Sequence, residues 1–69
     1  MDDKSRKDIR RILKIFGIKA DEAMTNYLDR NPEVGSLRIR ISLEDLTDYS
    51  DQNPEGEIGF SVEGEILRD

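Results

Sequence analysis

The side chains that could do chemistry in this 69-residue chain are carboxylates, amines, guanidinium groups and hydroxyls, because it has neither histidine nor cysteine. The lack of histidine removes the commonest general base and metal ligand, and the lack of cysteine excludes disulfides and thiolate metal sites. Paired carboxylates need burial to separate their pKa values, and every acidic residue falls where we expect solvent. We therefore expect a non-enzymatic protein with no catalytic residue and no cofactor.

The densest group of candidate ligands lies between residues 44 and 56. Asp51, Asn53 and Glu55 are spaced two residues apart and precede a glycine. This stretch resembles the first eight positions of an EF-hand calcium loop, whose oxygen ligands alternate before a turn glycine. The resemblance then fails, because Val62 occupies the position of the bidentate glutamate and the flanks alternate like strands. A calcium-binding acidic loop is thus an alternative function, but we expect an acidic turn without a metal.

The same acidic link offers candidates for protein contact. A leucine and a tyrosine stand among its carboxylates, and aromatic side chains dominate interface hot spots. These two side chains either anchor a partner or fold under the link to hold it, and the sequence leaves both possibilities open. With two arginines from the preceding strand, the candidate interaction residues are Leu46, Asp48, Tyr49, Asp51, Arg38 and Arg40.

Basic side chains gather in the N-terminal segment. Residues 1–19 carry seven basic and three acidic side chains, whereas residues 20–69 carry four basic and thirteen acidic ones. A cationic helix face can bind nucleic acid, an anionic membrane surface or an acidic protein. A solvated helix face is the simpler interpretation. The residues of this basic face are Lys7, Arg10, Arg11 and Lys14.

Two helices followed by a hairpin would resemble the order of a winged-helix domain, which implies nucleic-acid binding as a further alternative. Against this, the helix that would enter the major groove carries Asp21, Glu22 and Asp29, and the wing would be the acidic link. Phosphate repulsion would offset the attraction of the basic face. The charge distribution therefore disfavours nucleic acid.

The spacing of apolar residues predicts a first helix from about residue 4 to residue 16. Ser5 and Asp8 have the spacing of a capping box, and Gly17 would end the helix in a left-handed turn. The expected apolar stripe consists of Ile9, Ile12, Leu13 and Phe16.

A second helix is predicted from about residue 20 to residue 30. Asn31 and Pro32 would end it, since the residue before proline is displaced from helical geometry. Its expected stripe consists of Ala20, Ala23, Met24, Tyr27 and Leu28.

Strict alternation predicts strands over residues 36–43 and about 57–66, joined by the thirteen-residue acidic link. A register with Ile41 opposite Phe60 would place both apolar rows on one face and set Arg38 opposite Glu63. A slip of one residue would turn both rows to solvent.

These elements predict an α+β fold in which two N-terminal helices pack on one face of an antiparallel β-hairpin, in the order α-α-β-β. We expect one domain over residues 1–69 and a core from both apolar stripes and both apolar rows. The expected core is Ile9, Ile12, Leu13, Phe16, Ile18, Met24, Tyr27, Leu28, Val34, Leu37, Ile39, Ile41, Leu43, Ile58, Phe60, Val62 and Ile66.

The leading functional prediction is a small acidic protein-interaction module that acts through the sheet edge, the acidic link or both. Its partner would be another protein or a second copy of the chain, as an open strand edge can pair with either. No apolar run approaches the roughly 20 residues of a membrane span, and the N-terminus has no hydrophobic signal core. We therefore expect a cytoplasmic location.

Overall fold

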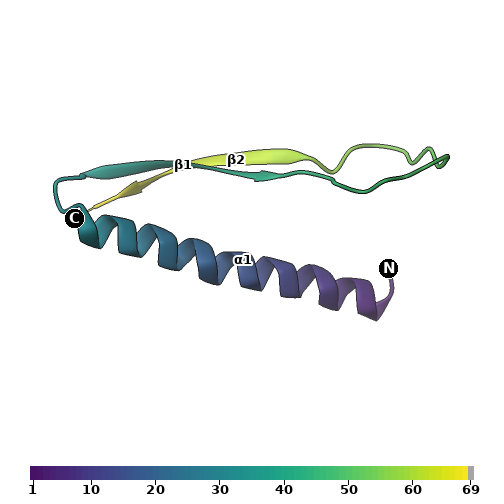
Figure 1. Cartoon of the computed structure of the whole chain (residues 1–69), viewed down its shortest axis with the longest axis horizontal. Coiled ribbons are helices and arrows are strands. Elements are labelled where there is room, and N and C mark those ends of the chain that lie inside the picture. Colours follow the sequence, from purple (N-terminus) through teal and green to yellow (C-terminus); the bar gives the residue numbers. More distant parts are fainter. Residues whose placement is uncertain (69) are drawn as a thin grey trace. The chain divides into compact units, whose positions relative to one another are not determined.

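The structure is a computed structural model that describes residues 1–68, and its element order is α-β-β. The helix α1 spans Asp3–Arg30, and the strands β1 and β2 span Ser36–Leu43 and Phe60–Leu67 (Figure 1). The chain divides into two units, residues 1–34 and the remainder from Gly35 onward. Each unit is described by itself. The overall class is α+β, but the prediction of two N-terminal helices is wrong, because a single helix precedes the hairpin.

The expected helix stop at Gly17 is absent, and α1 runs through it without interruption (Figure 1). Glycine in a helix interior costs only about 0.5–1 kcal/mol relative to alanine, which the favourable residues on both sides can offset. The apolar stripe also stays in phase, since Phe16 and Ala20 are four residues apart and share a face. Among residues 1–68, Gly56 is the glycine with a positive φ. Both expected helices are therefore halves of one amphipathic helix.

The N-terminus of α1 is capped by Asp2, one turn earlier than expected. The Asp2 carboxylate accepts a hydrogen bond of 2.8 Å from the backbone N–H of Ser5, which satisfies one of the free donors of the first turn. The predicted capping box of Ser5 and Asp8 is wrong. Asp8 instead lies 3.1 Å from the Lys4 ammonium and 3.6 Å from the Arg11 guanidinium.

The helix α1 ends at Arg30 with Asn31 as its C-cap, in keeping with the proline that follows. The Asn31 backbone N–H donates to the Leu28 carbonyl at 3.2 Å, and its side-chain amide donates to the Tyr27 carbonyl at 2.7 Å. Two carbonyls of the last turn are thereby satisfied. The helix end is thus fixed by local hydrogen bonds.

The two strands form an antiparallel pair, and β1 has the range that the alternation predicts. The predicted register is wrong by two residues, since Ile41 lies opposite Val62 and not opposite Phe60. A two-residue slip leaves every side chain on its expected face. The observed register sets Arg40 opposite Glu63 and also pairs a second arginine with a second glutamate, whereas the predicted register paired only one. Opposite charges across strands favour this alignment.

The strand β2 begins at Phe60, three residues later than predicted, so the link extends from Glu44 to Gly59. Continuing the observed register outward would set Ile58 opposite Asp45 and Gly59 opposite Glu44. Asp45 is already engaged by hydrogen bonds within the link, and glycine contributes no side chain to a strand pair. The ladder therefore ends at the pair of Leu43 and Phe60.

The expected core is not formed within the described structure, since none of residues 1–68 is buried. On the apolar face of α1, the Phe16 side chain keeps 47% of its surface exposed. On the apolar face of the hairpin, Phe60 keeps 60% exposed. The reason is architectural. Within its own unit, neither the lone helix nor the two-stranded sheet has a second layer to cover its apolar face.

Candidate functional site

The first candidate surface is the apolar face of the hairpin, which we call the hairpin face. The register places seven large apolar side chains on one side of the two strands, with Gly64 between them. Several are substantially exposed, and Phe60 and Val62 retain 60% and 56% of their surface. The hairpin face consists of Leu37, Ile39, Ile41, Leu43, Phe60, Val62 and Ile66.

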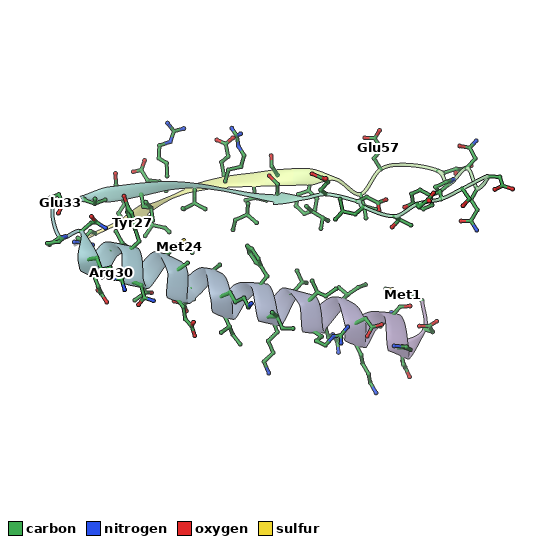
Figure 2. All side chains as sticks on the ribbon, in the orientation of Figure 1. Met1, Met24, Tyr27, Arg30, Glu33 and Glu57 are labelled. Atoms are coloured by element: carbon green, nitrogen blue, oxygen red, sulfur yellow. The ribbon has the colours of Figure 1, made fainter. Side chains whose placement is uncertain are left out.

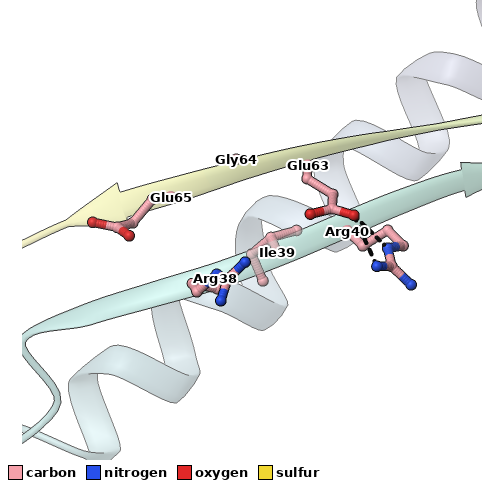
Figure 3. A pocket seen from close by; sticks show the side chains of 6 residues that line it. All are labelled: Arg38, Ile39, Arg40, Glu63, Gly64 and Glu65. Atoms are coloured by element: carbon pink, nitrogen blue, oxygen red, sulfur yellow. Dashed lines mark hydrogen bonds and ion pairs between the residues drawn. The ribbon is translucent and has the colours of Figure 1, made fainter.

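The opposite side of the hairpin is charged. The Arg40 guanidinium contacts Glu63, with Nη2 2.8 Å and Nε 2.9 Å from the same carboxylate oxygen (Figure 3). Arg38 lies opposite Glu65 in the same ladder. These four side chains line a shallow hollow of about 460 Å³ over the strand pair. Since the charges are matched within the hairpin, they specify its register and leave little net charge to attract a ligand.

The link is ordered by hydrogen bonds among its own residues. The Asp45 carboxylate accepts from the backbone N–H of Thr47 at 3.0 Å and from the Tyr49 hydroxyl. One turn further on, the Asp48 carboxylate accepts from the backbone N–H of Ser50 at 3.0 Å. Such aspartate-capped turns hold a loop without needing a core. The link therefore has a defined shape at the end of the hairpin.

The contact between Tyr49 and Asp45 changes the acidity of both groups. The Tyr49 hydroxyl donates to the carboxylate and, with help from Thr47, lowers the pKa of Asp45 below its ordinary value of 3.8. The same bond holds the phenolic proton and raises the pKa of Tyr49 above 10.0. Both shifts favour the observed bond, with the Tyr49 hydroxyl as donor and the Asp45 carboxylate as acceptor.

A hollow of about 700 Å³ lies where the strands enter the link. Its walls combine apolar side chains from the strand ends with polar groups from the link, and Glu57 projects from the chain just before β2 (Figure 2). The wall residues that bear on recognition are Leu43, Asp45, Tyr49, Pro54, Ile58 and Phe60. The hairpin face therefore continues into the link, with acidic groups at its border.

The predicted interaction residues lie in two places, the link and the charged side of the strands. Tyr49 is half-buried and turns toward Asp45, whereas Leu46 is 83% exposed. The tyrosine is thus bonded within the link, whereas the leucine points to solvent. Asp48 caps a turn of the link, and the two arginines lie on the charged side of the strands. Asp51 is exposed in the link. Sequence reasoning missed Asp45, although its spacing to Thr47 is typical of an aspartate-capped turn.

The weak calcium candidates Asp51, Asn53 and Glu55 are all exposed. Within residues 1–68, no three acidic side chains come together in a way that could hold a metal ion. The EF-hand geometry needs a loop flanked by helices, whereas this segment joins two strands. The arrangement of the link accordingly gives no support to an ion site.

The basic face of helix α1 is solvent-exposed at Lys7, Arg10, Arg11 and Lys14. Arg11 is partly neutralised by Asp8, which is shared with Lys4. The winged-helix order that suggested nucleic-acid binding assumed two separate helices, and this assumption is wrong. The basic face is therefore a charged stripe on a straight helix, without a second helix to enter a groove.

Among residues 1–68, no helix has both the length and the apolar character that crossing a membrane requires. Comparison of the chain with protein-family models, with curated proteins and with solved structures found no match.

Proposed function

We propose that the hairpin unit is a non-enzymatic protein-interaction module that binds a partner through the hairpin face and the acidic link. The observation that carries the proposal is the exposure of the hairpin face, where Phe60, Val62 and Leu43 retain 60%, 56% and 47% of their surface. Clustered apolar surface of this kind is typical of interaction sites. A partner that covers it would supply the second layer that the sheet lacks within its own unit.

The strand edges add a second means of attachment. The sheet has two strands in the part of the chain that the structure describes, so the outer N–H and C=O groups of both strands are available. A partner strand can add to such an edge through backbone hydrogen bonds, while side-chain pockets provide specificity. The alternation of the hairpin face would then select a partner strand with apolar residues at every second position.

The link defines the charge of the partner. Residues 44–57 carry six acidic side chains and no basic one. Opposite charge across an interface accelerates association and excludes like-charged competitors. Because hydrogen bonds already order the link around Asp45 and Asp48, less conformational entropy is lost on binding. We therefore expect a partner that carries lysine or arginine beside an apolar strand.

The experiment is affinity capture from a lysate of the source organism with four versions of the chain. Leu46→Ala removes the exposed side chain of the link, and Phe60→Ser removes apolar surface from the hairpin face. Ile15→Ser is the matched control, because Ile15 is 49% exposed but belongs to α1.

We expect one basic partner that is captured by the wild type and by Ile15→Ser and is lost with the two hairpin variants. Circular dichroism should show unchanged secondary structure in all four. Capture that is equal for all versions, or no specific capture by the wild type, would contradict the proposal.

A further inference from the structure

The helix α1 carries a regular apolar seam that the proposed function does not use. Six residues follow each other at alternating spacings of four and three, which is the repeat of a helix that packs along another helix. The seam is exposed at Ile9 (47%), Leu13 (63%), Phe16 (47%) and Tyr27 (49%). The seam residues in order are Ile9, Leu13, Phe16, Ala20, Ala23 and Tyr27.

The continuity of α1 makes this seam usable. The helix has 28 residues and is therefore about 42 Å long, with the seam along its central three heptads. Met24 and Tyr27 lie along the same side of the helix (Figure 2). Had the helix ended at Gly17, the two halves of the seam would have pointed in unrelated directions.

The sizes of the seam residues are graded along the helix. The N-terminal half presents Leu13 and Phe16, whereas the C-terminal half presents Ala20 and Ala23. In an antiparallel pair of α1 helices, Phe16 would face Ala20 of the second copy and Leu13 would face Ala23. In a parallel pair, phenylalanine would face phenylalanine and alanine would face alanine. The phenylalanine layer would then be overpacked and the alanine layers would leave cavities. The seam is therefore complementary to itself only in the antiparallel direction.

The charges of α1 favour the same direction. Residues 3–19 carry seven basic and two acidic side chains, and residues 20–30 carry three acidic and one basic. An antiparallel arrangement sets the basic half of each helix beside the acidic half of the other, whereas a parallel one aligns like with like. One unfavourable contact remains, because Lys19 would flank the midpoint in both copies. The Lys19 side chain is exposed to solvent, so salt screens its repulsion with the second copy.

The area is close to what a specific pair needs. An apolar stripe about 100° wide on a helix of this length covers about 400–500 Å², so a pair would bury about 800–1,000 Å². The upper end of this range reaches the lower bound of about 1,000 Å² for a specific interface. The expected dimer is consequently one that dissociates in the micromolar range and not an obligate one.

We propose that α1 is a homodimerisation helix that pairs antiparallel with α1 of a second copy along the seam from Ile9 to Tyr27. The proposal concerns a different unit from the proposed function and does not depend on it. Loss of helix pairing would leave partner capture by the hairpin to be judged by its own variants.

Sedimentation of the full chain over a range from about 1 µM to about 1 mM tests the pairing. Phe16→Glu places a charge in the seam, and Ile18→Glu is the matched control, because Ile18 is 51% exposed and points away from the seam at helical spacing. We expect a reversible wild-type dimer, a dissociation constant raised at least about tenfold in Phe16→Glu, and little change in Ile18→Glu. A wild-type chain that is monomeric throughout, or equal effects of both variants, overturns the proposal.

The direction of pairing is tested with a spin label, since the chain has no cysteine of its own. The label is attached to Lys7→Cys, near the N-terminus of α1 and outside the seam. In the antiparallel dimer, Lys7 lies opposite Asp29 of the second copy, so the two labels should be about 30 Å apart. In a parallel dimer they would be separated by about the helix spacing and the label arms. A short distance therefore overturns the antiparallel assignment.

Discussion

The helix unit and the hairpin unit differ in how the sequence specifies which backbone groups pair with each other. In α1, the backbone hydrogen bonds join residues four apart, so each turn is specified by its own neighbourhood. In the hairpin, the paired residues are 17 apart at Leu43 and Phe60 and 31 apart at Ser36 and Leu67. Both units end with one apolar face and no buried residue. The amphipathic pattern therefore determines the apolar face of both units. The hydrogen-bonding partners follow from the four-residue spacing in the helix, whereas the strand register must be selected in the hairpin.

This difference decides which changes each unit tolerates. A residue with low helix propensity inside α1, such as Gly17, stays helical because the turns on either side of it are formed. In the hairpin, a residue that pairs poorly across the strands shifts or ends the strand ladder, as the start of β2 at Phe60 illustrates. The predictions below test this contrast, beginning with the largest expected effect.

The largest effect is expected where local continuity is broken in α1. Gly17→Pro removes a backbone donor and introduces a steric clash with the preceding turn, at a cost of about 3 kcal/mol or more. We expect a marked loss of the helical signal at 222 nm in circular dichroism. A signal equal to that of the wild type would show that residues 16–18 do not form continuous helix.

Gly17→Ala provides the opposite test at the same position. A Cβ added at Gly17 would meet no atom within 4 Å apart from its chain neighbours and the backbone of its own helix, so alanine should favour the helix by about 0.5–1 kcal/mol. We expect a higher thermal midpoint of the helical signal. If Gly17 were instead the left-handed end of a shorter helix, alanine would lower the helical content.

A smaller effect on stability is expected from a change to the charge pair that favours the strand register of the hairpin. Arg40→Glu would place two like charges across the strands at Glu63 and should cost about 0.2–1 kcal/mol. The effect is limited because the two side chains remain 67% and 52% exposed and are screened by salt. Hydrogen exchange of the strand amides should be faster in this variant.

The double exchange Arg40→Glu with Glu63→Arg is the control for that variant. It restores opposite charges in the observed register, so amide protection should return to near the wild-type level. Protection that stays low would indicate that the pair does not specify the alignment.

A pH-dependent effect is expected at the N-terminus of α1. The hydrogen bond from the Ser5 backbone N–H lowers the pKa of Asp2 below its ordinary value of 3.8. The cap therefore stabilises the helix above pH 3.8, and this contribution is lost as pH falls through the lower folded value. The Ser5 amide shift, followed by NMR, should titrate in this acidic window. Asp2→Asn keeps an acceptor oxygen without a titrating group, so its Ser5 amide should not show this step.

The smallest and most local effect is expected in the link. Tyr49→Phe removes the hydroxyl that donates to Asp45, so the pKa of Asp45 should rise toward 3.8. In the wild type, the same bond should raise the pKa of Tyr49 above 10.0. NMR titration of the Asp45 carboxyl carbon measures the change, and Tyr27→Phe in α1 is the matched control. An unchanged Asp45 titration would contradict the hydrogen bond.

Much of the local structure could be predicted from the residues. The alternation over residues 36–43 predicts β1 with its observed bounds, and Asn31 before Pro32 predicts the end of α1. The link was predicted to end at Gly56, whereas the structure extends it to Gly59 because β2 begins at Phe60. The different placement of Tyr49, which turns toward Asp45, and of Leu46, which stays exposed, could not be predicted, because it depends on the hydrogen bond to Asp45.

By itself, the sequence determined which faces are apolar, where proline ends the helix, and where the acidic charge lies. Whether Gly17 interrupts α1 could not be read from the residues, because glycine adopts helical and left-handed conformations about equally readily. Only the structure decided the register, since an alternation of period two is unchanged by a slip of two residues. That slip was resolved by the pairing of Arg40 with Glu63, a contact between residues 23 positions apart.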